Sequence, residues 1–219
     1  MKGLETEEKK PLKLIKALEV SITHLAMTKI AIPSGLIDQN IEMFSVSGKM
    51  MATHSGVVKS LFDLPSDFLQ ILMDEMNSSD SIIKALSFSG YHTPEARLEK
   101  FAECRFGGFD FTADFKDGKL SEVEYHECGF RNNCPMEGIV CGFFKVNGSV
   151  ITPFEIQMIK HLATEDTIPV ITEKLNVSRN TFETKKQKLF EKMGVLSRTR
   201  LIALCYDYQI LNPGLCSNP

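Results

Sequence analysis

One stretch of the sequence, residues 178–194, combines a helix start signal, a helical repeat and a helix stop signal. Ser178 can cap a first turn with its side-chain oxygen, and Gly194 stands where a left-handed residue ends a helix. Between them, apolar side chains recur at helical spacing along one side, at Phe182, Leu189, Phe190 and Met193. The sequence therefore predicts an amphipathic helix of about four turns with one packing face.

The opposite face of this helix carries polar and basic side chains: Arg179, Asn180, Glu183, Thr184, Lys185, Gln187, Lys188 and Glu191. The formal net charge of −3 divides into −5 for residues 1–150 and +2 for residues 151–219, and residues 174–200 hold eight Lys or Arg against two Glu. Local positive charge in an acidic protein is typical of a surface that neutralises DNA phosphates. A solvated helix surface can have the same composition, so charge alone leaves both interpretations open.

Three further helices are predicted around this one. Thr152-Pro153-Phe154-Glu155 is a capping box with proline at the first helical position, and it predicts a helix over residues 153–163. Thr167 can begin a short second helix, and Ser197 can begin a fourth, whose apolar stripe is Leu201, Leu204, Cys205 and Tyr208. Four helices in about 60 residues, with a tight turn between the second and the third, indicate a helix-turn-helix unit.

Three motifs carry a resemblance to a known family: T-P-x-E from Thr152, I-x-E-K-L-x-V-S-x-N-T ending at Thr181, and K-M-G-V-x-S-R-T from Lys192. With them, residues 151–211 resemble the LuxR-type (GerE-like) DNA-binding domain. The resemblance implies base-edge contacts by Glu183, Thr184 and Gln187. It implies phosphate contacts by Thr181, Lys185 and Lys188, to which charge alone adds Arg179. It also implies a dimer contact through the fourth helix, at Leu201, Cys205 and Tyr208.

The sequence departs from the family pattern in several places. Glu165-Asp166 stands where the family usually has glycine, so the turn after the first helix must close without one. Thr172 replaces a small alanine, and Lys186 replaces an apolar residue, although its stem can cover apolar surface. Glu183 can accept a hydrogen bond from a cytosine amine but repels backbone phosphate. We therefore expect an unusual sequence preference.

The residues before the helix-turn-helix unit predict a second, mixed domain. Helical spacing and start signals predict helices over residues 11–32, 66–76, 79–88 and 93–103. Residues 36–60 show no clean period, and we expect a loop with short elements there. From residue 109 the period changes to two, and Asp117-Gly118 is a favoured two-residue turn. With Lys119–His126 as the returning strand, this pattern predicts a β-hairpin with one aromatic face.

Four cysteines gather around the open end of this hairpin: Cys104, Cys128, Cys134 and Cys141. The hairpin register would bring the first two together, and the other two follow in the adjoining loop. Four such thiolates could bind zinc in a tetrahedron or hold an iron–sulfur cluster, with His126 as a substitute ligand. The spacing lacks the C-x2-C knuckle of zinc sites, and small buried thiols explain the cysteines equally well. No histidine stands in a relation to these cysteines that marks a nucleophile–base pair, so we expect no enzyme.

The length of 219 residues and the hydrophobic content of 43% suit two modest domains. We place an α+β N-terminal domain at residues 1–141, a linker at 142–150 and an all-α four-helix domain at 151–219. The charged N-terminal segment is no signal peptide, and no run approaches the about 18 apolar residues needed to span a membrane. We therefore expect a cytoplasmic protein.

Together these features predict a transcription regulator that binds double-stranded DNA as a homodimer through its helix-turn-helix. Its N-terminal domain would sense a signal or bind a partner. Two alternatives remain open. One is a factor that contacts RNA polymerase and resembles the promoter-reading end of a sigma factor. The other is a metal- or redox-responsive binding module in which the cysteine cluster is the main function.

Overall fold

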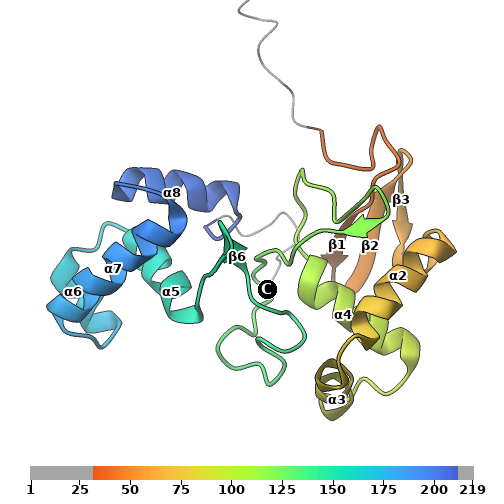
Figure 1. The fold of residues 1–219 in the computed structure, drawn as a ribbon, viewed down its shortest axis with the longest axis horizontal. Coiled ribbons are helices and arrows are strands. Elements are labelled where there is room, and N and C mark those ends of the chain that lie inside the picture. Colours follow the sequence, from red (N-terminus) through yellow and green to blue (C-terminus); the bar gives the residue numbers. More distant parts are fainter. Residues whose placement is uncertain (1–31, 212–219) are drawn as a thin grey trace, which may run out of the picture. The chain divides into compact units, whose positions relative to one another are not determined.

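The computed structural model describes residues 32–211 (Figure 1). Over this range the chain folds into helices and small antiparallel sheets, so the predicted α+β class is confirmed. The helix predicted over residues 11–32 lies outside the described residues, apart from Ile32. No helix within residues 32–211 combines the length and the apolar character needed to cross a membrane.

A three-stranded antiparallel sheet forms between residues 36 and 60, where we expected a loop with short elements. Its strands lie in the order β1-β2-β3, with bounds Glu42–Val46, Lys49–His54 and Val57–Ser60. Ser47-Gly48 and Ser55-Gly56 make the two turns with positive φ at both positions, the geometry that matches the twist of a hairpin. The expected short elements are therefore strands. Their pairing into a sheet was not predicted, because strands of four to six residues show no clean period, while the serine–glycine pairs carried the turn signal.

Helices pack against this sheet and against one another. After a short 3-10 helix, η1, they are α2, α3 and α4, with bounds Leu61–Asp63, Ser66–Asn77, Asp80–Phe88 and Pro94–Phe106. Helix α4 packs against β1 and β2, and α2 and α3 pack against α4. The three predicted helices are confirmed, with α4 three residues longer than expected. With the sheet they enclose the first core, whose members include Met43, Phe68, Leu72, Leu86 and Phe101.

The predicted hairpin after α4 forms only at its tip. Strands β4 and β5 contain two residues each, Phe115–Lys116 and Lys119–Leu120, and residue 116 pairs with residue 119 as expected. The longer strands are absent from the described structure, and Phe111 is exposed rather than part of an aromatic face. The chain before the turn lies along β1 instead, where Ser45 donates its N–H to the Gly107 carbonyl (3.1 Å).

Four acidic side chains, here the carboxyl cluster, meet where this segment lies against β1: Glu42, Asp110, Asp114 and Glu124. Glu42 accepts the Asp110 N–H (2.7 Å), and Asp114 accepts the Met43 N–H (2.6 Å). Glu42 and Asp114 are fully buried, and one oxygen of each has no hydrogen-bond partner among the described residues. Burial, and then the neighbouring carboxylates, raise the pKa of Glu42 to about 9 and that of Glu124 to about 8. Glu42 and Glu124 therefore hold protons at neutral pH.

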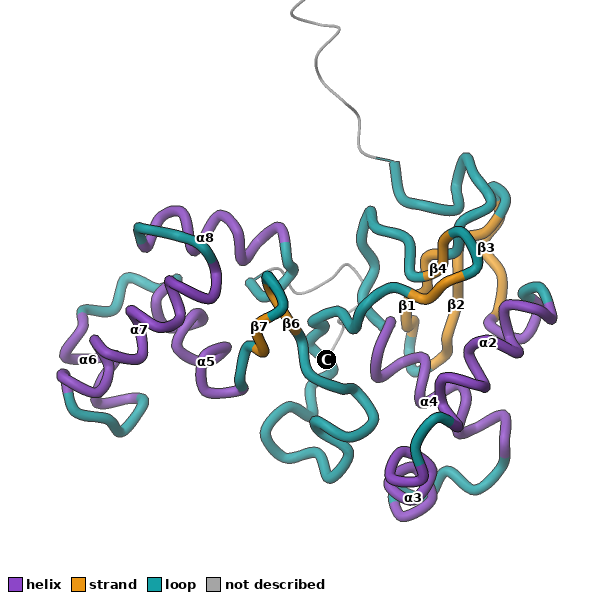
Figure 2. The backbone as a smooth tube through the Cα atoms, viewed as in Figure 1, coloured by secondary structure: helices purple, strands orange, loops and turns teal. Residues whose placement is uncertain are grey.

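The remaining described chain builds the second core. A hairpin of β6 and β7 precedes the helices α5, α6, α7 and α8, with bounds Lys145–Val146, Ser149–Val150, Pro153–Leu162, Ile168–Lys174, Arg179–Met193 and Arg198–Asp207. All four helices were predicted, and the β6–β7 hairpin lies in the segment that we placed as a linker. The second core also contains Tyr125 and Val146, with Phe144 packed against it, so residues before position 151 contribute to it. Figure 2 shows that most of the chain between β4 and β6 has neither helix nor strand.

Candidate nucleic-acid interface

Helix α7 begins and ends at the residues that carry the sequence signals. Ser178 accepts a hydrogen bond from the Thr181 N–H with its side-chain oxygen (3.2 Å). At the other end Gly194 is left-handed, with φ of 65°, and Val195 donates its N–H to the Phe190 carbonyl (3.0 Å). The predicted boundaries of this helix are thus confirmed.

The packing face of α7 is fixed by the second core. Phe182, Leu189 and Met193 are buried in it, and α7 contacts both α5 and α6. The turn from α6 to α7 is short, and the Val177 N–H closes it on the Thr172 carbonyl (3.0 Å). Because one side of α7 is held by this packing, the opposite side is presented to solvent as one rigid surface.

The turn between α5 and α6 closes without glycine, as the sequence required. Arg198, at the start of α8, donates to the carbonyls of Leu162 and Thr164, each at 2.6 Å. In the same loop, Asp166 forms an ion pair with Lys174 (2.7 Å). The guanidinium of Arg198 therefore donates hydrogen bonds to carbonyls at the end of α5. In a turn that contains glycine, backbone N–H groups could supply these hydrogen bonds instead.

All seven residues expected to contact DNA lie on the solvent side of α7. Six are exposed and Glu183 is partly buried: Arg179, Thr181, Glu183, Thr184, Lys185, Gln187 and Lys188. Thr184 donates its hydroxyl to the Asn180 carbonyl (2.9 Å), and Gln187 donates to Glu191 (3.2 Å). Within the described residues no carboxylate lies in ion-pair range of the three cations among the seven. Their charge is therefore open to an external anion.

A groove of about 540 Å³ runs between the start of α5 and α7, and several of these residues line it. Among the lining residues, Lys185 lies over the Phe154 ring, with Nζ 4.7 Å from the ring centroid. Glu155 also lines the groove, but Lys192 pairs with it at 2.8 Å. Burial by itself would raise the pKa of Glu155, and the hydrogen bonds from Lys192 and Thr152 lower it overall. The one carboxylate in the groove is therefore neutralised internally.

Glu183 is the acidic exception on this face, and its charge is also compensated. It forms an ion pair with Lys186, one turn further along α7. Lys186 lies over the Phe182 ring with Nζ 5.8 Å from the centroid, so its stem covers the apolar side chain as expected. The pairing reduces the repulsion that Glu183 would exert on phosphate, and its carboxylate remains an acceptor.

Of the residues expected at a dimer contact on α8, Leu201 and Cys205 are fully buried in the second core. Tyr208 is partly buried and stacks edge-on against Phe144, with ring centroids 5.7 Å apart. These side chains therefore stabilise the fold of a single chain. A dimer interface on α8 stays a prediction and would have to use other side chains, such as the exposed Tyr206.

The four clustered cysteines are free, partly buried thiols, whereas Cys205 is buried. Burial raises the pKa of the Cys104 thiol to about 12. In the part of the chain that the structure describes, no three His, Cys, Asp or Glu side chains are arranged to hold a metal ion. Sequence reasoning missed the carboxyl cluster, because nothing local marks an acidic residue as buried.

The solvent side of α7 is thus a rigid, cationic surface that also presents hydrogen-bonding side chains, on a scaffold whose second and third helices are joined by a tight turn. Such a surface can bind a polyanion through its cations. Its hydroxyl, amide and carboxylate groups can distinguish between different hydrogen-bonding groups of that polyanion. Comparisons with protein-family models, with curated proteins and with solved structures found no match to this chain.

Proposed function

We propose that this protein is a transcription regulator that binds double-stranded DNA sequence-specifically, with α7 in the major groove. One observation carries the proposal: the exposed side of α7 groups Arg179, Lys185 and Lys188 around Thr184 and Gln187. The motifs that resemble the LuxR-type domain support the same role. In this role the protein binds rather than catalyses, and the residues before the second core sense a signal or bind a partner.

The dimensions of α7 suit this role. Its 15 residues make a rod about 22 Å long, and the major groove is wide enough to admit an α-helix. Lysines at the edge of such a helix reach phosphates, whereas side chains that point into the groove reach base edges. On α7 this assigns Lys185 and Lys188 to phosphates, and Thr184, Gln187 and Glu183 to bases. Glu183 would favour cytosine, because its carboxylate can accept a hydrogen bond from the cytosine amine.

The test begins with selection of bound duplexes from a random pool by the full-length protein. Affinity for the selected duplex and for a random duplex is then measured at two salt concentrations. Lys188→Ala should weaken binding to both duplexes, since it removes one phosphate contact. The slope of the logarithm of the affinity against the logarithm of the salt concentration should become shallower by about one. Lys49→Ala, which removes the same charge from an exposed position on β2, is the matched control.

Two results would refute the proposal. One is that the pool yields no enriched sequence, and the other is that Lys188→Ala and Lys49→Ala bind a random duplex alike. If the full-length protein bound promoter DNA only together with RNA polymerase, the polymerase-associated alternative would replace it.

A further inference from the structure

The loop of residues 126–141, here the cysteine loop, touches the end of α4 at two points. Arg105 of α4 donates from Nε to the Val140 carbonyl (3.0 Å). The imidazole of His126 packs on Gly107, where an added Cβ would lie 2.9 Å from its Nε2. Cys104 lies beside Arg105 and one turn before Gly107. The two contacts therefore bring the neighbourhoods of Cys141 and Cys128 to the same end of α4 as Cys104.

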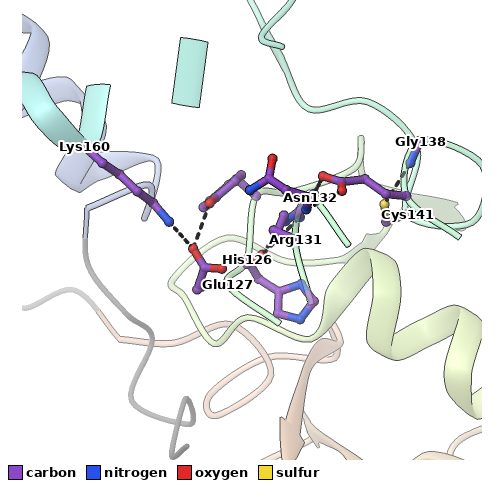
Figure 3. A network of polar contacts seen from close by, with 9 residues as sticks. His126, Glu127, Arg131, Asn132, Gly138, Cys141 and Lys160 are labelled. Atoms are coloured by element: carbon purple, nitrogen blue, oxygen red, sulfur yellow. Dashed lines mark hydrogen bonds and ion pairs between the residues drawn. The ribbon is translucent and has the colours of Figure 1, made fainter. Parts of the chain in front are cut away.

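The cysteine loop is braced internally by polar contacts (Figure 3). Arg131 donates to the His126 carbonyl from Nε (3.2 Å) and from Nη2 (3.0 Å), which closes a turn around Cys128. The Asn132 N–H donates to a carboxylate oxygen of Glu137 (2.6 Å), which closes a second turn around Cys134. The two turns thus hold Cys128 and Cys134 within one braced loop, which ends at Cys141.

One thiol of the loop already has a hydrogen bond of the kind that favours a thiolate. The Gly138 N–H donates to the Cys141 sulfur at 3.3 Å, as Figure 3 shows. Cys104 and Cys134 both pack against the first core and remain only partly buried. Four thiols from α4 and one loop, with an N–H aimed at one of them, are the ligand type that soft divalent metals prefer.

We propose that Cys104, Cys128, Cys134 and Cys141 together bind one thiophilic divalent cation of the zinc class. The four thiols release their protons as the ion binds, and the thiolates become its ligands. Since no three ligands stand in place among residues 32–211, the cysteine loop must close onto Cys104 when the ion binds. Binding is therefore coupled to a movement of the cysteine loop toward α4.

The two ends of the cysteine loop are attached to the second core. Tyr125 and Phe144, which flank the loop, stack edge-on with centroids 6.0 Å apart and belong to or pack on the second core. Lys160 of α5 also pairs with Glu127 of the loop (Figure 3). A metal ion bound to Cys104 would thus join α4 to the helices that carry the candidate DNA surface.

The direct test measures metal binding by the full-length protein. Metal is removed with a chelator under reducing conditions, and the protein is titrated with Zn²⁺ and, as a spectroscopic probe, with Co²⁺. We expect one equivalent of either ion and the visible absorption of tetrahedral thiolate-bound Co²⁺. Each single change, such as Cys104→Ser or Cys134→Ser, should weaken zinc binding at least about tenfold, because it removes one of four ligands. Cys205→Ala is the control, since that thiol lies in the second core.

A second measurement does not depend on variants that could fail to fold. Alkylation of the wild-type protein, followed by mass spectrometry, should show that one equivalent of Zn²⁺ protects the four cysteines together. Binding of no stoichiometric ion, or labelling that zinc leaves unchanged, would overturn the proposal. Loss of zinc in His126→Ala but not in Cys134→Ser would also overturn it, because the fourth ligand would then be the imidazole.

Discussion

The carboxyl cluster should make the protein less stable as the pH rises from 7 to 8. Glutamate in an unfolded chain has a pKa near about 4.3 and is ionised throughout this range. Folded Glu42 and Glu124 have pKa values of about 9 and about 8, raised by burial, so the folded chain holds protons that the unfolded chain releases. The free energy of unfolding therefore falls with rising pH. The stabilisation is complete below the pKa that these glutamates have in the unfolded chain. It is lost as the pH rises through the pKa values that they have in the folded chain.

Each proton held only by the folded chain lowers the free energy of unfolding by about 1.4 kcal/mol per pH unit. Two such protons correspond to about 3 kcal/mol between pH 7 and pH 8. The carboxyls of the cluster titrate together, so we expect a loss between about 1.4 and about 3 kcal/mol. His126 has its pKa lowered by burial to about 4, and its opposite effect on stability lies mainly below about pH 6.5.

Urea unfolding at several pH values between 7 and 8, followed by far-UV circular dichroism, measures this slope. Glu124→Gln keeps the size of the side chain but removes one titrating group. Because a group with a pKa of about 8 is half ionised at pH 8, the slope of this variant should be smaller by about 1 kcal/mol per pH unit. At pH 8 this variant should be more stable than the wild type. Glu122→Gln, at an exposed position two residues earlier, should leave the slope unchanged. A wild-type stability that is constant or rises over this range, or equal slopes in Glu124→Gln and the wild type, would refute the reasoning.

Three further predictions concern single side chains. Gln187→Ala should relax the preference at one base of a selected duplex by about 1–3 kcal/mol and leave random-duplex affinity unchanged, which competition binding measures. Phe182→Ala should cost about 3–5 kcal/mol, because it opens a cavity in the second core, and calorimetry should show a lower melting temperature. Gly35→Ala should also lower it, since Gly35 has a φ of 78° and an added Cβ would lie 2.2 Å from the Thr53 carbonyl oxygen. A melting temperature equal to that of the wild type would contradict either of the last two.

Helices could be predicted from the sequence because their signals are local. Ser79, Thr93, Thr152, Ser178 and Ser197 each accept an N–H bond at the start of a helix, and each is visible in the sequence. The apolar spacing that follows each cap also predicts the packing face. The exposed face of α7 was predicted on the same ground, because it is the remainder of a helix with one buried stripe.

Features that depend on distant residues could not be predicted in this way. The hairpin after α4 was expected to continue because its residues alternate, but the chain there pairs with β1 and gives Asp110 and Asp114 to the carboxyl cluster. Only the folded structure shows that these acids meet Glu42, which lies some 70 residues away in the sequence. Likewise, Cys104 meets the cysteine loop through contacts of Arg105 and Gly107 that no spacing rule contains.

Tyr125, Phe144 and Val146 contribute to the second core. This determines where a fragment that contains the helix-turn-helix can begin. A fragment that began at residue 151 would leave exposed the apolar surface that Val146 and Tyr125, each at most 4% exposed, now cover. A fragment that retains this surface has to begin near residue 125 and therefore includes the cysteine loop. Any recombination that transplanted the helix-turn-helix intact would transfer three of the four clustered cysteines with it and leave Cys104 behind.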